Sequence, residues 1–426
     1  MNKLALFGGK PVRKSFPQNW PEFGQDEEES LREVVRSGKW WMYSYVPETL
    51  SRVAKFERKF ARFQRVKHCL AVSSGSAALE ICVRALGIKP GDEVITTPYT
   101  FIATVSCLLN HYAFPVFVDI DPATYQIDPR RVEAAITERT KAIIPVHFGG
   151  NMADMDSLML LARKYNLKVI EDAAQAHSAC YHDGRSAGGI GDMGIFSFQW
   201  SKNLTCGEGG AVTTSDERLA DLAWSLRHYG RERNGIWYQH YRSGWNLRMS
   251  EFQAAVLLTQ LKRLKSQTLR RMRNYRLVMK LLDGLPGVKP MALNPAQKVF
   301  PHHLVIFRYF PEEWGNVPLE KFLKALEAEG IPAGPGYPIP LYRQPVFRNL
   351  DFSRTSPFMI GRKKPVNYQE CADSCPNAEA ACAGHTIWLA GRLLLFEPKD
   401  IRTVAEAFWK LWENRAHLLE QNKPSR

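Results

Sequence analysis

The sequence has no uninterrupted run of about 20 apolar residues, the length that a membrane-spanning helix requires. Its first residues, MNKLALFGGKPVRKSFP, interrupt a short apolar run with two glycines and several charges, so they do not resemble a secretion signal. Internal repeats and low-complexity segments are absent as well. We therefore expect a globular protein of the cytoplasm that has no membrane partner.

Cysteine is sparse and irregularly placed, with eight residues spread over 426 positions. The cysteines lack the density of a disulfide-stabilised scaffold and the C-x-x-C pairs of a zinc ribbon. Cys371, Cys375, Cys382 and His385 could approach one metal ion, but their spacing matches no standard site. We expect reduced, mostly buried thiols and no bound metal.

Positive charge exceeds negative charge by 14, which is compatible with nucleic acid, a membrane surface or an anionic small substrate. The basic residues are dispersed, and the densest run, KRLKSQTLRRMRNYR at 262–276, has the spacing of a helix. A solvated helix face or an oligomer contact explains this run better than a nucleic-acid patch does. We therefore expect no nucleic-acid partner.

Between residues 68 and 214, short apolar runs alternate with helical stretches. The expected strands are 68–72, 93–97, 114–120, 141–146, 167–172, 194–198 and 210–214, and the expected helices include 76–86, part of 101–113, and 155–164. Repeated strands and helices of this kind are typical of α/β proteins. The pattern predicts an open, mostly parallel sheet with helices on both faces.

The pattern changes after about residue 250, where helical periodicity dominates 250–285. A strand at 302–310 and helices at 319–331 and 400–415 then predict a smaller α+β unit. We expect a large domain at 1–260, and a helical arm with a small C-terminal domain at 261–426. Prolines suggest loops at 336–347 and 375–385.

Polar residues follow three of the predicted strands, where ligands bind in open parallel sheets. SSGSA at 73–77 follows one strand and opens a helix, Asp172 ends a second strand, and Lys202 follows Ser197 after a third. An anion-binding turn, a carboxylate and a strand-end lysine are the groups that pyridoxal phosphate needs. From spacing alone, an ordinary turn, a helix cap and a solvated lysine stay open as the alternative.

From Leu6 to beyond Phe347 the chain resembles the DegT family of aminotransferases that depend on pyridoxal phosphate (PLP). The matching runs are ALFGGKPVR, SGSAALEICVRALGIKPGDEVITTPYTFIAT, PVFVDIDPATY, IIPVHFGGNMADMD, VIEDAAQAHSA, GDMGIFSFQWSKNLTCGEGGAVTT and NLRMSEFQAAV. The resemblance implies the fold type I architecture and PLP as the cofactor.

The resemblance also implies a role for individual residues, by position. Lys202 matches the Schiff-base lysine, which moves a proton between substrate and cofactor, and Asp172 matches the partner of the pyridine nitrogen. Further cofactor contacts are implied for Ser76 and Ala77 at the phosphate turn, Ser197 at the phosphate, Gln175 near the ring hydroxyl, Phe101 on the ring face, and Asn246. Asn246 matches a residue that reaches the phosphate of the neighbouring subunit, which implies a homodimer with shared active sites.

Because Lys202 is present, where related dehydratases have histidine, the resemblance implies reversible transamination. L-Glutamine or L-glutamate is the expected amino donor, and a keto cyclitol similar to scyllo-inosose, or a keto sugar, is the expected acceptor. The residues around Gln199 resemble the branch of inosose aminotransferases and aminohydroxybenzoate synthases. A nucleotide-keto-sugar aminotransferase, or a regulatory protein that binds PLP without turnover, is the alternative.

Four further features have open interpretations. Tyr342 stands where many sugar enzymes of the family carry a histidine. His147 and His177 flank the predicted cofactor strands and could touch a ligand or serve only the core. Trp40 and Trp41 are expected to pack or to contact another subunit. The glycine-rich run at 184–194 precedes a strand, so it does not indicate a dinucleotide site.

Overall fold

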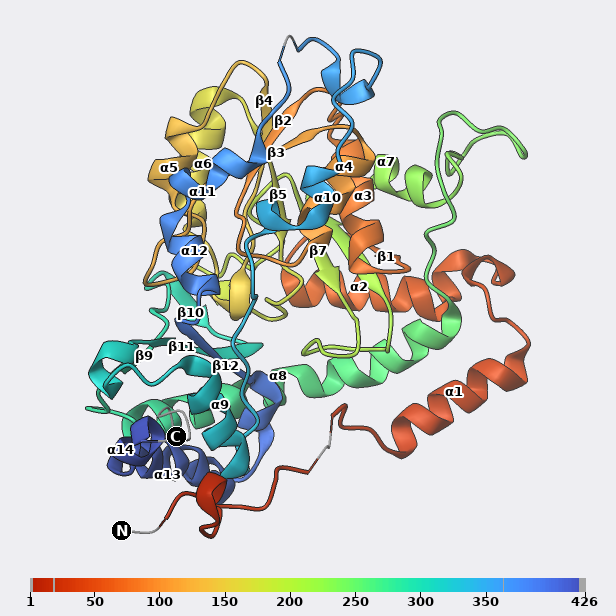
Figure 1. Ribbon diagram of the computed structural model, residues 1–426. Coiled ribbons are helices and arrows are strands. Elements are labelled where there is room, and N and C mark those ends of the chain that lie inside the picture. Colours follow the sequence, from red (N-terminus) through yellow and green to blue (C-terminus); the bar gives the residue numbers. More distant parts are fainter. Residues whose placement is uncertain (1–2, 18–19, 363, 421–426) are drawn as a thin grey trace.

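The computed structural model describes residues 3–17, 20–362 and 364–420. A seven-stranded sheet forms its centre, in the order β1-β8-β7-β5-β4-β2-β3 (Figure 1). The strands are β1 (His68–Val72), β8 (Gly210–Thr214), β7 (Met193–Ser197), β5 (Lys168–Asp172), β4 (Thr140–Ile144), β2 (Glu93–Thr96) and β3 (Phe114–Phe117). All seven predicted strands are present, and the predicted α/β class is confirmed.

The sheet is parallel from β7 through β5, β4 and β2 to β3. Strand β8 runs antiparallel to both of its neighbours, β1 and β7. The carboxyl ends of the parallel strands therefore meet at one edge, which is where such sheets bind ligands.

Helices cover both faces of the sheet, as expected. The helices of this part are α1 (Gln25–Ser37), α2 (Arg52–Gln64), α3 (Gly75–Ala85), α4 (Ala103–Asn110), α5 (Pro129–Ala134), α6 (Met155–Tyr165) and α7 (Glu217–Arg227). One buried cluster joins α2, α5 and α6 to one face of the sheet, and another joins α3, α4 and α7 to the opposite face. Successive strand residues divide between them: Val169 belongs to the first cluster and Ile170 to the second.

The long predicted helix is α8 (Glu251–Leu281), which packs on α1 and α2 and also on α13. Beyond it lies a three-stranded antiparallel sheet, β12-β11-β9. Its strands are β9 (Val288–Pro290), β11 (Leu304–Tyr309) and β12 (Thr386–Ala390), and the main helices beside it are α9 (Leu319–Ala328), α13 (Pro398–Glu413) and α14 (Arg415–Glu420). The proposed boundary at residue 260 falls inside α8, and the division into two domains stays a prediction.

The segment between α9 and β12 packs against the large sheet, as Figure 1 shows in blue. It carries the short helices α10 (Pro345–Arg348), α11 (Cys371–Ser374) and α12 (Pro376–Cys382). The expectation of a loop at 375–385 was wrong for α12. The Asp119 carboxylate accepts hydrogen bonds from the amides of Asn377 (3.0 Å) and Ala378 (2.9 Å), and this distant cap stabilises the start of the helix.

A second small pairing joins β6 (Cys180–Tyr181) to β10 (Gln297–Val299), so the C-terminal half also contacts the large sheet domain here. All eight cysteines are free, and five of them are buried. In the described ranges, no group of three His, Cys, Asp or Glu residues could hold a metal ion. No helix there is long and apolar enough to cross a membrane.

The densest basic run lies on α8, and several of its charges are paired. Arg263 forms an ion pair with Glu27 of α1, and Arg270 bonds to Glu22 at 3.3 Å. Arg271 is fully buried, 5.4 Å from the ring of Trp20. These three residues make contacts within the subunit, whereas Lys262, Lys265, Arg273 and Arg276 are exposed, as a solvated helix face requires.

We predict that Glu251→Ala destabilises the fold. The buried Glu251 carboxylate accepts from the amides of Arg52 (2.8 Å) and Val53 (3.0 Å), at the start of α2. Alanine leaves both amides without this acceptor, which costs about 3 kcal/mol. Urea unfolding followed by circular dichroism measures the loss, with the exposed Lys265→Ala on the same helix as the control, expected within about 0.5 kcal/mol of the native protein. Equal stability of the two variants would contradict the prediction.

Candidate active site

A cavity of about 550 Å³ opens at the carboxyl edge of the parallel strands. Six of the eight residues predicted from the family resemblance line it: Ser76, Phe101, Asp172, Gln175, Ser197 and Lys202. Residues between positions 76 and 202 thus meet in one place because their strands and loops end at the same edge of the sheet.

Lys202 lies in the loop after β7, and its amide donates to the carbonyl of Gln199 at 2.9 Å. Its side chain lines the cavity and is half-buried. Burial lowers the pKa of the Lys202 ammonium, and the negative charge of Asp172 opposes this shift. A lysine with a lowered pKa is more often a free amine, the form that acts as a nucleophile.

Asp172 is the last residue of β5 and is buried. Its Oδ2 accepts from the Thr104 hydroxyl at 2.9 Å, and its Oδ1 accepts from the Ala174 amide at 3.2 Å. Burial raises the pKa of the carboxyl group, whereas Thr104, Ala174 and Lys202 lower it. Hydrogen bonds to both oxygens fix the direction in which the carboxylate faces the cavity.

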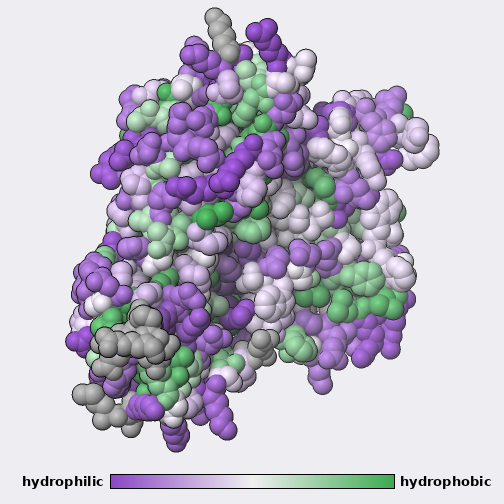
Figure 2. Space-filling view, viewed as in Figure 1, coloured by the Kyte–Doolittle hydropathy of each residue, from purple (hydrophilic) through white to green (hydrophobic). Residues whose placement is uncertain are grey.

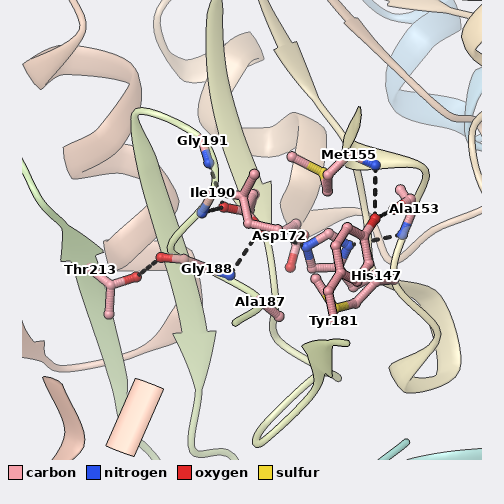
Figure 3. A network of polar contacts seen from close by, with 12 residues as sticks. His147, Ala153, Met155, Asp172, Tyr181, Ala187, Gly188, Ile190, Gly191 and Thr213 are labelled. Carbon is pink, nitrogen blue, oxygen red and sulfur yellow. Dashed lines mark hydrogen bonds and ion pairs between the residues drawn. The ribbon is translucent and has the colours of Figure 1, made fainter. Parts of the chain in front are cut away.

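The preceding residue, Glu171, points to the opposite face of the sheet and is also buried. Its carboxylate accepts from the amides of Gly188 (2.9 Å), Ile190 (2.6 Å) and Gly191 (2.7 Å), in the network of Figure 3. These contacts explain the glycine-rich run before β7. The backbone of this turn curves around the Glu171 carboxylate, so that three amides donate to it. They also anchor the end of β5 beneath the cavity.

His147 belongs to the same network and does not line the cavity. Its Nδ1 accepts from the Ala153 amide at 3.2 Å, so we assign the proton to Nε2, which donates to Glu171 at 2.9 Å. His177 is fully buried against Phe196 and Phe198. Burial, with the positive charge of Lys202, lowers the pKa of His177 to about 3. Neither histidine is among the residues that line the cavity, and both are buried in the core next to it.

The start of helix α3 faces the cavity through Ser74, Gly75 and Ser76. The Ser74 hydroxyl accepts from the amide of Ala77 at 3.0 Å, so the Ala77 amide is already bonded. A Cβ atom at Gly75 would lie 2.8 Å from Cβ of Ser197, which explains the glycine there. The free amides of a helix start, together with the helix dipole, favour a bound anion such as a phosphate.

Phe101 lines the cavity, whereas Tyr99, two residues earlier, is fully buried in an aromatic cluster. Gln175 holds the turn after β4, since its Oε1 accepts from the Gly149 amide at 2.7 Å. Asn246 is exposed, forms an isolated antiparallel β-bridge with His228, and does not line this cavity. The cofactor contacts of these residues stay predictions.

Four lining residues that the sequence did not indicate come from the C-terminal part: His303, Leu304, Tyr337 and Trp388. The rings of Tyr337 and Trp388 lie 4.9 Å apart, nearly perpendicular. Their sequence neighbourhoods carry no motif that distinguishes them from core residues. Tyr342 is buried and donates its hydroxyl to Glu379 at 2.8 Å, so it does not line the cavity.

A seven-stranded sheet of this order, with a desolvated lysine at its carboxyl edge, defines a fold type I transferase. The chain belongs to the DegT/DnrJ/EryC1/StrS aminotransferase family, whose model matches residues 21–360. It is an aminotransferase, as the resemblance implied.

Comparison with known proteins supports this assignment over nearly the whole chain. The chain is 37% identical to the L-glutamine:2-deoxy-scyllo-inosose aminotransferase of Streptomyces lividus, over 97% of the chain and 99% of that protein. It is 40% identical to a pleiotropic regulatory protein of Geobacillus stearothermophilus, over 76% of the chain and 82% of that protein. The crystal structure of 3-amino-5-hydroxybenzoic acid synthase is similar with a TM-score of 0.82 and 33% identity, over 97% of the chain and 100% of that structure.

We predict that Thr104→Val makes PLP binding more sensitive to acid. Removing the Thr104 hydroxyl bond raises the pKa of Asp172 further, because that bond stabilises the ionised carboxylate. An ionised Asp172 is lost as pH falls through its pKa, so the variant loses cofactor at a higher pH than the native protein. PLP affinity measured by absorbance from pH about 4 to 8 tests this.

Ser106→Ala is the matched control for this test. It removes a hydroxyl from the same helix that, among the described residues, bonds only to the carbonyl of Ile102, at 3.0 Å. If the Thr104 variant and this control released PLP at the same pH as the native protein, Thr104 would have no role in holding Asp172 ionised.

Proposed function

We propose that the enzyme uses PLP to move an amino group from L-glutamine or L-glutamate to the ketone of a keto cyclitol. The observation that supports this most is the cavity in which Lys202, Asp172 and the start of α3 meet. The Streptomyces lividus relative, by its name, uses L-glutamine and 2-deoxy-scyllo-inosose, and it matches nearly the full chain.

The residues present fit PLP at three points. The start of α3 and the Ser197 hydroxyl provide donors for its phosphate, and the lack of a side chain at Gly75 lets the start of α3 lie close to Ser197. Asp172 provides a carboxylate for a protonated ring nitrogen, and Phe101 provides a ring face. When bound, PLP supplies an electron-withdrawing ring that stabilises negative charge on the substrate carbon.

Lys202 is the residue proposed to hold PLP covalently and to move the proton of the reaction. Its free amine would accept the proton from the substrate carbon and deliver it to the cofactor carbon on the other side of the amino nitrogen. The lowered pKa of Lys202 supports the first step, because an ammonium ion cannot accept a proton. The hydrogen bonds from Thr104 and Ala174 favour the ionised form of Asp172.

The charge of the cavity favours an uncharged acceptor. Among the described residues that line it, Lys202 is the only lysine or arginine. A nucleotide-linked sugar carries a diphosphate, which arginine and lysine side chains bind best. A keto cyclitol needs only hydrogen-bonding groups and apolar contacts, and the lining offers both through Gln199, Ser201 and Trp388.

We also propose a homodimer in which Asn246 reaches the other subunit's cofactor. Large apolar side chains are exposed outside the cavity, among them Val46 (91%), Trp237 (82%) and Trp40 (54%). Figure 2 shows a hydrophobic patch over the region of α1 and the start of α8, surrounded by hydrophilic surface. Exposed apolar groups of this size are typical of surfaces that bind a protein. The free cysteines support a reducing compartment, for which we propose the cytoplasm.

A regulatory protein that binds PLP without turnover is the rival function, favoured by the name of the Geobacillus stearothermophilus relative. A cavity lysine could hold PLP in either kind of protein, so Lys202 alone does not distinguish the two functions. The two functions differ in the amino-donor half-reaction, which only an aminotransferase performs.

We predict that L-glutamine or L-glutamate bleaches the yellow absorbance of the PLP-loaded protein. Lys202→Ala should slow this conversion at least about a thousandfold, because no other lysine or arginine lines the described cavity to transfer the proton. Lys141→Ala, an exposed lysine of β4, is the control and should react as the native protein does. Full turnover by Lys202→Ala would refute the role of Lys202, and a native protein that ignores both donors would favour the regulatory rival.

We predict further that UDP and dTDP bind the native holoenzyme no more tightly than about 1 mM, because the described lining holds no lysine or arginine besides Lys202 to bind a diphosphate. Isothermal titration calorimetry measures this directly. Micromolar binding of either nucleotide would instead support the nucleotide-keto-sugar alternative.

A further inference from the structure

His303 precedes β11 and lines the catalytic cavity together with Lys202. Its segment is fixed from two sides. The side chain of Asn203, next to Lys202, donates to the carbonyl of Pro301 at 2.9 Å, and the amide of Gly391 donates to the carbonyl of His303 at 2.8 Å. The imidazole is therefore held beside the catalytic lysine by the backbone.

The hydrogen bonds of the ring define its tautomer. Nδ1 of His303 is sealed from solvent and has no hydrogen-bond partner among the described residues. Buried N–H groups without an acceptor are rarer in proteins than acceptors without a donor, so we assign Nδ1 as unprotonated. Since the side chain lines the cavity while Nδ1 is sealed, the ring faces the cavity with its other edge, which carries the Nε2 proton.

The surroundings also keep the imidazole uncharged. Burial lowers the pKa of His303 well below its usual value, and the cationic groups of Lys202, Arg271 and Arg392 lower it further. The uncharged imidazole therefore offers the cavity one N–H donor, at Nε2.

We propose that His303 is a substrate-binding residue that donates from Nε2 to a hydroxyl or carbonyl oxygen of the keto cyclitol. This proposal rests on the proposed function, and it assigns one contact that determines the acceptor. A neutral donor suits a neutral oxygen, whereas a carboxylate entering a buried cavity needs cationic or multiple donors to offset its lost hydration. The carboxylates of the amino donor are thus poorer partners for His303.

Three variants of the holoenzyme test the contact. His303→Phe keeps a ring of similar shape without a donor, His303→Leu is a second donor-free variant, and His303→Gln keeps a neutral N–H. His182→Leu, at an exposed histidine, is the control. Single-turnover experiments follow each half-reaction separately, by loss of yellow absorbance with L-glutamine and by its return with the keto cyclitol.

We expect His303→Phe to slow the acceptor half-reaction about tenfold at subsaturating ketone, because one neutral hydrogen bond contributes about that much. Most of the loss should appear as weaker apparent affinity for the ketone. His303→Gln should restore most of the rate, and the glutamine half-reaction should change less than about threefold. Equal losses in both half-reactions, or a loss confined to glutamine, would overturn the proposal.

A binding experiment tests the same contact without turnover. Calorimetry with scyllo-inositol, which has the hydroxyls but no ketone, should show weaker binding to His303→Phe and His303→Leu than to the native holoenzyme and His303→Gln. No binding by the native protein, or equal affinity in all variants, would overturn the proposal. If scyllo-inositol binds as expected but no keto cyclitol reacts, the proposed function fails while the contact of His303 stands.

Discussion

The removal of the Lys202 amine from water, beside the buried carboxylate of Asp172, is the constraint on which the structure of the site depends. Burial disfavours the charge on both groups, and each group partly stabilises the other's charge. The balance leaves an amine that ionises less readily and a carboxylate that needs hydrogen bonds to stay ionised. Thr104 of α4 and Ala174, just after β5, provide those bonds to the carboxylate of Asp172.

The alternation of side chains along β5 explains how the sheet supports this pair. Asp172 faces the cavity, and Glu171 faces the other side, where the amides of the glycine-rich turn and His147 hold it. A shift of one residue in the strand would exchange the two carboxylates and place Glu171 in the cavity. The buried network of Glu171 therefore fixes the register on which the position of Asp172 depends.

The sequence predicted the part of the site that strands and turns carry. Lys202, Asp172 and Ser76 follow strands whose apolar runs are evident, and the parallel sheet brings their ends together. His303 and Trp388 could not be predicted, because they enter the cavity by tertiary packing from a part of the chain about 100 residues or more further on. Helix α12 was missed for a similar reason, since its cap, Asp119, lies far away in the sequence.

The central claim is that Lys202 is the lysine that carries PLP. Borohydride reduction of the holoenzyme makes the bond between PLP and its lysine permanent, and mass spectrometry of the peptides then locates it. The account predicts one phosphopyridoxyl group per chain, on the peptide that contains Lys202. Labelling of another lysine, or none after saturation with PLP, would contradict it.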